Sequence, residues 1–385
     1  MKEDRKKIIV WLYPDNHLRH PFICIAVESL INHGYSLTVI DKASEKTNQY
    51  HHIPLYPPVL SDSRKFIPLL IKVFQIVFYE LMVQWCSLRH TLQRAPSMII
   101  VTMPHMLVVG WIASLLLRAR LIYYPFELYG EQHSVASGWV KKIETLCLRR
   151  GIDALITQNE ERAKLYKDER GARVRPVIVH NYKPCRTVKS SGKLRKMLKL
   201  SDTERIVLYE GMLVHGRWLD KLIQSAAYLP SDTKLVFMGN EMPWWRQNAG
   251  RLLNMPEIAG KVLVTPYVSQ QDLLSYVADA DIGVIIYDDK VRNNYYCEPG
   301  KLSDYVIAGV PLIGPNFPTI APVVRRYAIG AVFNSPEPEE IARAIRHVLS
   351  TPRHVWQAAL EQARKDLVWE TQVPNLLKAI NRELR

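Results

Sequence analysis

The clearest chemistry in this sequence comes from two basic residues that each follow a glycine turn. Gly211 ends an apolar run, permits a tight turn and lets a ligand approach the backbone closely. Arg217 follows shortly after it, and a guanidinium can bind two phosphate oxygens at once. Gly300 and Lys301 open a later helix, whose N-terminus favours anions such as a diphosphate. We therefore predict that these two turns bind a diphosphate.

Carboxylates lie in the same stretch and in one further loop. Asp304 falls one turn into the helix that begins near Lys301, where it can accept hydrogen bonds from a vicinal diol such as a ribose. Glu127 and Glu131 lie in a loop after an apolar run, and α/β sheets place their chemistry beyond the carboxyl ends of parallel strands. We regard both glutamates either as site residues or as solvated loop residues.

The elements that must position these residues have the order of α/β domains. Apolar runs at 8–13 and 36–41 are typical of buried parallel strands, and a helix between them ends at Gly34. The same order of strand, glycine turn and helix begins again at residue 205. The 385 residues also exceed the roughly 250 to 300 that share one core. We predict an α/β protein with two doubly wound, Rossmann-like domains.

The domain boundary is predicted from a change in composition. Residues 186–202 are polar and basic, with no apolar period before Leu194, which is typical of a linker. This places the N-terminal domain at residues 1–185 and the second domain at 203–365.

The charge is distributed unevenly. Residues 1–200 hold 31 Lys and Arg against 16 Asp and Glu, so the net charge of +14 comes entirely from the N-terminal half. A basic half favours an anionic partner, either a phosphorylated acceptor or an anionic membrane surface. We expect no nucleic acid as partner, because no nucleic-acid motif accompanies the charge. The five scattered cysteines contain no C-x-x-C pair, which favours the cytoplasm over a disulfide framework or a zinc site.

The most hydrophobic segment covers residues 65–86. Its length approaches a membrane span, but Lys72, Gln75, Glu80 and Gln84 interrupt it on one side of the helical wheel. We predict an amphipathic helix, either in the core of the first domain or lying in a membrane interface. The second alternative corresponds to peripheral binding at the cytoplasmic face of a membrane.

The helix that follows Glu298 resembles the sugar-nucleotide loop of retaining glycosyltransferases of family 4, also called glycosyl transferases group 1. The family pattern is P-N-K-L-x-E-Y-x-x-A-G-x-P, and weaker matches run in order through most of the chain. The residues that carry the resemblance here are Pro299, Gly300, Lys301, Leu302, Asp304, Tyr305, Ala308, Gly309 and Pro311.

The resemblance implies the GT-B architecture, in which two Rossmann-like domains face a cleft. It implies transfer of a sugar from a nucleoside diphosphate sugar to an acceptor hydroxyl, with retention of configuration and no cofactor or metal ion. The acceptor would be a glycan, a lipid-linked molecule or a small molecule, as in polysaccharide biosynthesis. Residues 366–385 would form a terminal helix that returns to the first domain. We accordingly expect Asp288 and Asp289 not to bind a metal.

Family motifs also imply roles for single residues. Tyr267 and Val268 would face the nucleotide base, and Arg19 falls at the arginine of the family's first acceptor-side loop. Three departures from the family pattern accompany these matches. Met212 and Trp218 replace a frequent arginine and glycine, Phe126 replaces a histidine, and Tyr296 occupies the place of the first of two glutamates.

The departures determine the residues that we assign to catalysis. Glu298 substitutes for the missing glutamate, while Glu127 or His133 takes over from the missing histidine. The predicted catalytic residues are therefore Glu127, Arg217 and Glu298, and the acceptor side consists of Arg19, Glu127, Glu131 and His133.

Two other classes of function remain open from the sequence. A sugar-nucleotide epimerase or hydrolase of the same fold would release sugar without an acceptor. A catalytically inactive binding or scaffold subunit would bind nucleotide without turnover.

Overall fold

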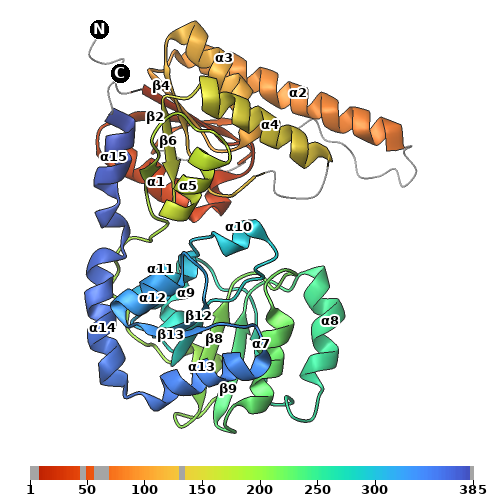
Figure 1. The fold of residues 1–385 in the computed structure, drawn as a ribbon, viewed down its shortest axis with the longest axis vertical. Coiled ribbons are helices and arrows are strands. Elements are labelled where there is room, and N and C mark those ends of the chain that lie inside the picture. The colour runs from red at the N-terminus through yellow and green to blue at the C-terminus, as the bar shows by residue number, and fades with distance from the viewer. Residues whose placement is uncertain (1–7, 44–48, 56–68, 130–134, 382–385) are drawn as a thin grey trace. The chain divides into compact units, whose positions relative to one another are not determined.

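The computed structural model describes residues 8–43, 49–55, 69–129 and 135–381 (Figure 1). The chain divides into two compact units. The first unit consists of residues 1–180 together with 372–385, and the second consists of residues 181–371. The predicted boundaries at 185 and 203 therefore fall inside the second unit, where Leu194 belongs to the buried core.

The first unit is built on a seven-stranded parallel sheet in the order β3-β2-β1-β4-β5-β6-β7. The order reverses direction between β1 and β4, which makes the unit doubly wound. Its strands are β1 (Ile8–Leu12), β2 (Ser36–Asp41), β3 (His51–Pro54), β4 (Met98–Val101), β5 (Arg120–Tyr123), β6 (Ala154–Thr157) and β7 (Val177–Ile178).

The helices of the first unit connect these strands and cover them. α2, α3 and α4 pack beside one another, and α15 packs against β6 and β7 (Figure 1). The helices are α1 (Pro21–Asn32), α2 (Leu69–Arg94), α3 (Leu107–Leu117), α4 (Val135–Arg150), α5 (Glu160–Asp168) and α15 (Val373–Asn381), with 3-10 helices η2 (His17–Arg19) and η3 (Pro104–Met106).

The second unit is built on a six-stranded parallel sheet in the order β10-β9-β8-β11-β12-β13. Its order reverses between β8 and β11, so this unit is doubly wound as well. Its strands are β8 (Arg205–Glu210), β9 (Thr233–Met238), β10 (Val262–Thr265), β11 (Ile282–Val284), β12 (Leu312–Pro315) and β13 (Gly330–Phe333). The prediction of two doubly wound α/β domains is confirmed.

The helices of the second unit follow its strands in turn. α13 packs against α7 and β13, and α11 packs against α9 and α14. The helices are α6 (Lys193–Leu198), α7 (Leu219–Ser225), α8 (Pro243–Leu253), α9 (Leu273–Val277), α10 (Arg292–Tyr295), α11 (Gly300–Ala308), α12 (Ala321–Tyr327), α13 (Pro338–Ser350) and α14 (Arg353–Asp366), with 3-10 helices η4 (Ala226–Tyr228) and η5 (Trp369–Thr371).

The predicted hydrophobic segment at 65–86 falls largely within α2, which continues to Arg94. Among the side chains of α2 that the structure describes, Leu81 and Trp85 are each 62% exposed, whereas Val83 and Ser87 are buried. The helix is therefore amphipathic in this part. Within the described residues, no helix is both long and apolar enough to span a membrane.

Candidate functional site

The candidate site of the second unit lies where the order of its sheet reverses. β8 and β11 are neighbours there, and their connections leave in opposite directions. In sheets of this kind, ligands bind in the crevice outside the carboxyl ends of the strands at this switch point. The β8–α7 loop supplies Gly211 and Arg217, while the chain after β11 supplies Tyr287 and Lys301.

The backbone at the end of β8 requires glycine. Gly211 has a φ of +125°, which side-chain-bearing residues rarely adopt. A Cβ atom on Gly211 would lie 3.0 Å from Nζ of Lys301 and 3.5 Å from Nη1 of Arg217. The structure therefore brings together three residues that the sequence predicted to bind a diphosphate. They come from two segments that are far apart in the chain, the β8–α7 loop and the start of α11.

Arg217 is held in place by neutral groups. Its Nη1 donates hydrogen bonds to the Tyr209 hydroxyl at 3.1 Å and to the Met212 carbonyl at 3.4 Å. Its guanidinium carbon lies 5.3 Å from the centroid of the Tyr287 ring, within range of a cation–π interaction. None of these partners neutralises its charge.

Lys301 is in a similar environment and is more deeply buried, with 8% of its surface exposed. Its ammonium donates to the Tyr287 hydroxyl at 3.3 Å and lies 5.1 Å and 5.2 Å from the ring centroids of Tyr209 and Tyr287. Burial raises the pKa of both tyrosines. Arg217 opposes that rise at both tyrosines and Lys301 opposes it at Tyr287, in each case only in part, so the phenols stay neutral. In the part of the chain that the structure describes, no carboxylate forms an ion pair with Lys301 or Arg217.

Helix α11 begins directly at this site. Pro299 is its N-cap residue, and Gly300 and Lys301 are its first two residues. Because the first N–H groups of a helix have no partner within it, they and the helix dipole favour an anion here. Leu302 is buried in the core of the second unit, so it anchors the start of the helix. The helix ends at Gly309, which has a φ of +70°.

The two acidic residues near α11 have partners in the chain just after residue 180. The Glu298 carboxylate accepts a hydrogen bond of 2.6 Å from the backbone N–H of Asn181. Both oxygens of Asp304 accept hydrogen bonds from the ammonium of Lys183, at 2.7 Å and 2.6 Å. The ribose role that the sequence predicts for Asp304 thus concerns a carboxylate that is already ion-paired.

Glu210 is a buried acid that sequence reasoning missed. It ends β8, is 7% exposed, and its Oε1 has no hydrogen-bond partner within the described structure. Burial and repulsion by Asp304 raise the pKa of Glu210 from 4.5 to about 7, against the opposing effect of Lys301 and Lys183. The Glu210 carboxyl can therefore carry a proton near neutral pH, next to the ion pair of Asp304 and Lys183.

Two further predicted residues follow the carboxyl end of another strand of this sheet. Tyr267 and Val268 come directly after β10, the outermost strand, which is separated from β8 by β9. The Tyr267 side chain is 54% exposed. Their role toward a nucleotide base stays a prediction.

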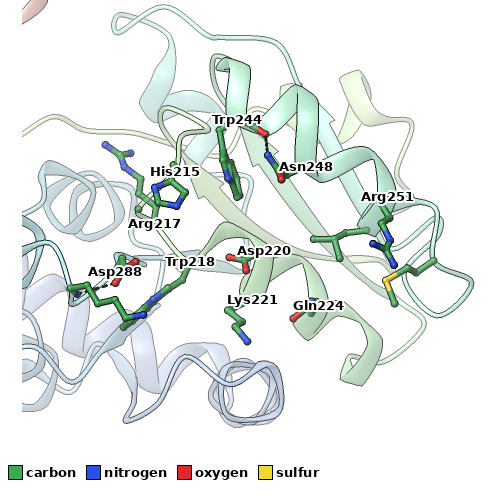
Figure 2. Close-up of a pocket in the computed structure, with 14 residues that line it drawn as sticks. His215, Arg217, Trp218, Asp220, Lys221, Gln224, Trp244, Asn248, Arg251 and Asp288 are labelled. Carbon is green, nitrogen blue, oxygen red and sulfur yellow. Dashed lines mark hydrogen bonds between the residues drawn. The ribbon is translucent and has the colours of Figure 1, made fainter.

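A pocket of about 780 Å³ adjoins this cluster, between α7, α8 and the β8–α7 loop (Figure 2). Asp220 and Gln224 from α7 face Trp244 and Asn248 from α8 across it (Figure 2). Arg217 lines the pocket, whereas Lys301 does not. The pocket therefore extends from one side of the cation pair, which consists of Arg217 and Lys301.

The acceptor-side prediction concerns the first unit. Glu127 follows β5 and is exposed, and its loop is held by Arg162, which donates to the Phe126 carbonyl at 2.6 Å. Arg19 ends η2, and its side chain is not described. Glu131 and His133 lie outside the described residues.

The structure also identifies a neighbour of Phe126, the residue at which the sequence resemblance implied a histidine. The imidazole of His20 lies 4.6 Å from the Phe126 ring, centroid to centroid. Burial lowers the pKa of His20 to about 4, and its Nδ1 is buried without a hydrogen-bond partner in the described chain. A neutral histidine therefore packs against Phe126. No local pattern in the sequence indicates this pairing, because the two residues are far apart in the chain.

Comparison with known families identifies the second unit. Residues 190–366 match the family described as Glycosyl transferases group 1. Most of the second unit is therefore similar to the glycosyl transferases group 1. The matched range contains the whole β8–α7 loop and the start of α11, so the cation pair lies in the part of the chain that resembles this family.

Solved structures resemble this chain over nearly its whole length. Sucrose-phosphate synthase from Thermosynechococcus elongatus has a TM-score of 0.78 at 16% identity, covering 98% of both chains. HepE from Anabaena, in complex with UDP-glucose, has a TM-score of 0.77 at 13% identity, covering 98% of this chain and 100% of that one.

WaaG, a glycosyltransferase involved in lipopolysaccharide biosynthesis, has a TM-score of 0.66 at 15% identity, covering 97% of this chain and 98% of that one. At such identities these likenesses show the fold alone, which is GT-B. A comparison with curated proteins found no match to this chain.

Proposed function

We propose that the protein transfers a sugar from a nucleoside diphosphate sugar to an acceptor hydroxyl, with retention of anomeric configuration. One observation carries this proposal. Arg217 and Lys301 converge on Gly211 at the switch point of a parallel sheet, and neither forms an ion pair with a described carboxylate. A cation withdrawn from water is unfavourable unless an anion meets it. A diphosphate is the anion that two cations and a helix N-terminus fit together.

The same groups act on the step that limits such a reaction. When the bond from C1 to the diphosphate oxygen breaks, the sugar gains oxocarbenium character and the diphosphate gains negative charge. Arg217, Lys301 and the N-terminus of α11 stabilise that charge without reorganising, because tyrosine rings and backbone already hold them in place. In a same-face reaction the acceptor oxygen attacks C1, and its proton leaves with the diphosphate. Such a reaction requires no covalent intermediate and no cofactor.

The remaining groups of the second unit bind the donor. We assign the ribose diol to Asp304, which gives up one of its two contacts with Lys183 when the diol binds. Glu298 faces the sugar hydroxyls, and Tyr267 with the backbone of Val268 faces the base. Because the related HepE structure contains UDP-glucose, uridine diphosphate sugars are the first donors to test.

The acceptor is assigned to the first unit. Arg19, Glu127, Glu131 and His133 form its acceptor side, with Glu127 as a residue that contacts the acceptor hydroxyl. Because related structures include an enzyme of lipopolysaccharide biosynthesis, we infer an acceptor of the glycan or lipid-linked class, as in polysaccharide biosynthesis.

A lipid-linked acceptor is supported by an exposed surface on α2, α3 and α4. We call it the apolar surface, and its exposed residues recur at helical spacing on each of the three packed helices. Basic side chains of α4 lie in the same helical rows, and the Lys142 ammonium lies 5.0 Å from the Trp139 ring centroid. The apolar surface consists of Leu81 and Trp85 of α2, Ile112, Leu115 and Leu116 of α3, and Trp139 and Leu146 of α4.

Apolar and aromatic side chains next to cations are the pattern that binds an anionic membrane interface. We infer that the protein binds the cytoplasmic face of a membrane peripherally through the apolar surface. An anionic lipid is thereby the partner, and the lipid-linked acceptor is drawn from the same membrane.

The donor can be identified by a thermal-shift screen. UDP, GDP, ADP, CMP and dTDP, each free and as sugar conjugates, are added to the purified protein. A ligand that binds only the folded state raises the unfolding midpoint by mass action. A shift that Arg217→Ala abolishes supports the proposal, with Arg251→Ala at the far end of the adjoining pocket as the matched control. A well-folded sample without any shift overturns it.

The reaction class is decided with the donor that the screen identifies. Incubation with that donor and a panel of glycan and lipid-linked acceptors should give a product whose anomeric proton coupling in NMR matches that of the donor. An inverted product overturns retention. Release of free sugar, or turnover of the donor into an epimer, assigns the protein to hydrolases or epimerases.

Sedimentation with vesicles tests the membrane partner. Vesicles that contain phosphatidylglycerol should bind the protein at low salt and release it at high salt. Trp139→Ala with Lys142→Glu should weaken binding, whereas the surface pair Arg353→Glu with Lys365→Glu should not. Equal binding of both double variants would overturn the assignment of the apolar surface.

A further inference from the structure

A second polar cluster, unrelated to the cation pair, is buried in the first unit. His17 from η2, Asp41 at the end of β2 and His52 of β3 come from three separate elements. One nitrogen from each histidine and one carboxylate oxygen all lie within 4.8 Å of one another. The sequence suggested no such site, because the spacing between the three residues matches no short metal motif.

The three side chains of this cluster are almost completely buried. The side chains of His17, Asp41 and His52 are 1%, 0% and 4% exposed. Within the described residues, Asp41 forms no ion pair with a lysine or an arginine, and the side chains that contact its carboxylate are two imidazoles. A buried carboxylate is stabilised by a cation. Two imidazoles and a carboxylate are also the donor set of three-ligand zinc sites.

From these observations we propose that His17, Asp41 and His52 bind a divalent transition-metal ion of the Zn²⁺ class. His17 would bind through Nδ1, Asp41 through a carboxylate oxygen and His52 through Nε2. Zinc bonds of roughly 2.0 to 2.2 Å at tetrahedral angles hold such ligand atoms about 3.3 Å apart. The His52 Nε2 and Asp41 Oδ1 atoms are 2.6 Å apart, and the His17 Nδ1 atom contacts Asp41 Oδ2 as well, so these contacts open by roughly 1 Å when the ion enters.

Neighbouring groups already orient the three ligands. The Asp41 carboxylate accepts backbone hydrogen bonds from His17 at 2.8 Å and from Ala43 at 3.0 Å. The second ring nitrogen of His17 contacts the Tyr50 hydroxyl, which can accept its N–H when Nδ1 binds the ion. Outer partners of this kind fix the ring orientation of metal-binding histidines.

The donor chemistry also selects among ions. Mg²⁺ and Ca²⁺ prefer oxygen ligands throughout, whereas imidazole with carboxylate suits Zn²⁺ and its transition-metal neighbours. Three protein ligands leave one position for water or another oxygen ligand. The ion would fix η2, which follows β1, to the end of β2 and the start of β3. This inference does not rest on the proposed sugar transfer.

Metal binding can be measured on the purified, untagged full chain after treatment with a chelator. We expect it to bind one Zn²⁺ per chain, with Mg²⁺ unable to compete. Bound Co²⁺ should give the intense visible absorption of a four- or five-coordinate site. His52→Ala and Asp41→Asn should each weaken Zn²⁺ binding at least about tenfold.

The adjacent His51 provides a matched control. It lies on the same strand and is exposed, so His51→Ala should leave Zn²⁺ affinity unchanged. Equal affinity in His52→Ala and His51→Ala would overturn the site, as would a Co²⁺ spectrum of the weak six-coordinate type.

If a variant does not fold, X-ray absorption of the Zn²⁺-loaded wild-type protein decides the question. Two imidazoles and one carboxylate in the first shell support the proposal. Fewer than two imidazoles would show that the cluster is a metal-free chain of hydrogen bonds from Tyr50 to His52.

Discussion

Lys183 and Asp304 form a buried ion pair in which one ammonium contacts both oxygens of one carboxylate. Asp304 is 2% exposed and the Lys183 side chain 16%. The pair links the first residues of the second unit to α11, the helix that carries Lys301. It therefore couples the start of this unit to the candidate site.

Removing Lys183 should be costly for the fold. Lys183→Ala leaves Asp304 buried without its cation next to Glu210, and breaking one partner of a buried pair costs roughly 3 to 5 kcal/mol. Urea unfolding followed by circular dichroism would measure this loss. Lys193→Ala is the control, because its pair with Asp272 spans 4.0 Å between half-exposed side chains and should contribute less than about 1 kcal/mol. Equal stability of the two variants would contradict the role of the buried pair.

Glu210 should make the stability of the second unit depend on pH. Its folded pKa of about 7 lies above its ordinary 4.5, so the folded state retains a proton that the unfolded state has lost. Stability should therefore fall as the pH rises from about 4.5 through 7.

The variant Glu210→Gln, which resembles the protonated acid, should lack this contribution. Its free energy of unfolding relative to wild type should rise by roughly 2 kcal/mol between pH 5 and pH 8. Denaturant titrations at both pH values would measure the difference. A difference that does not change with pH would show that Glu210 is ionised throughout.

Lys301 should raise the affinity for a nucleoside diphosphate without stabilising the ligand-free protein. The isosteric change Lys301→Met removes a buried cation that contacts tyrosines and forms no ion pair with a described carboxylate, so the ligand-free protein should be as stable as wild type or more stable. The affinity for a nucleoside diphosphate should fall at least about tenfold, measured by isothermal titration calorimetry. Lys221→Met, in the adjoining pocket, should leave that affinity unchanged. Loss of both stability and affinity in Lys301→Met would mean that Lys301 serves the fold instead of a ligand.

Gly239, which directly follows β9, should not be replaceable by a residue with a side chain. A Cβ atom there would lie 1.9 Å from the Gly211 carbonyl oxygen, far inside any contact distance. Gly239→Ala should therefore destabilise the protein by about 3 kcal/mol or more, measured by thermal unfolding. Gly250 of α8 has open space around its Cβ position, so Gly250→Ala should stabilise by up to about 1 kcal/mol. Similar midpoints for both variants would contradict the close approach of the two strands.

The fold could be predicted because its strands are buried on both faces. Ile8–Leu12 and Arg205–Glu210 stand out as short apolar runs bounded by loops, which is what strands inside a parallel sheet require. Arg217 and Lys301 were proposed from the sequence because residue type and an adjacent glycine turn together indicate an anion site, and the structure places both next to Gly211. Both kinds of signal lie within a few residues of each other in the chain.

The residues that were missed depend on contacts between distant segments. Lys183 lies next to residues that have the composition of a linker, and only its contact with Asp304 distinguishes it from a solvated lysine. Glu210 ends an apolar strand, and its raised pKa comes from Asp304 and burial. His17 and Asp41 meet only because β1 and β2 are paired. No local pattern carries information of this kind.

The first unit consists of two stretches of chain, and this has a consequence for its synthesis. The ribosome completes residues 1–180 before it begins the second unit, and residues 372–381 appear only after that unit has been made. Until then β6 and β7 lack α15, whose buried Leu376 and Ile380 cover them. Domains generally fold during synthesis in N- to C-terminal order. Here the first unit to emerge would be the last to be completed, with part of its sheet uncovered and open to chaperones in the interval.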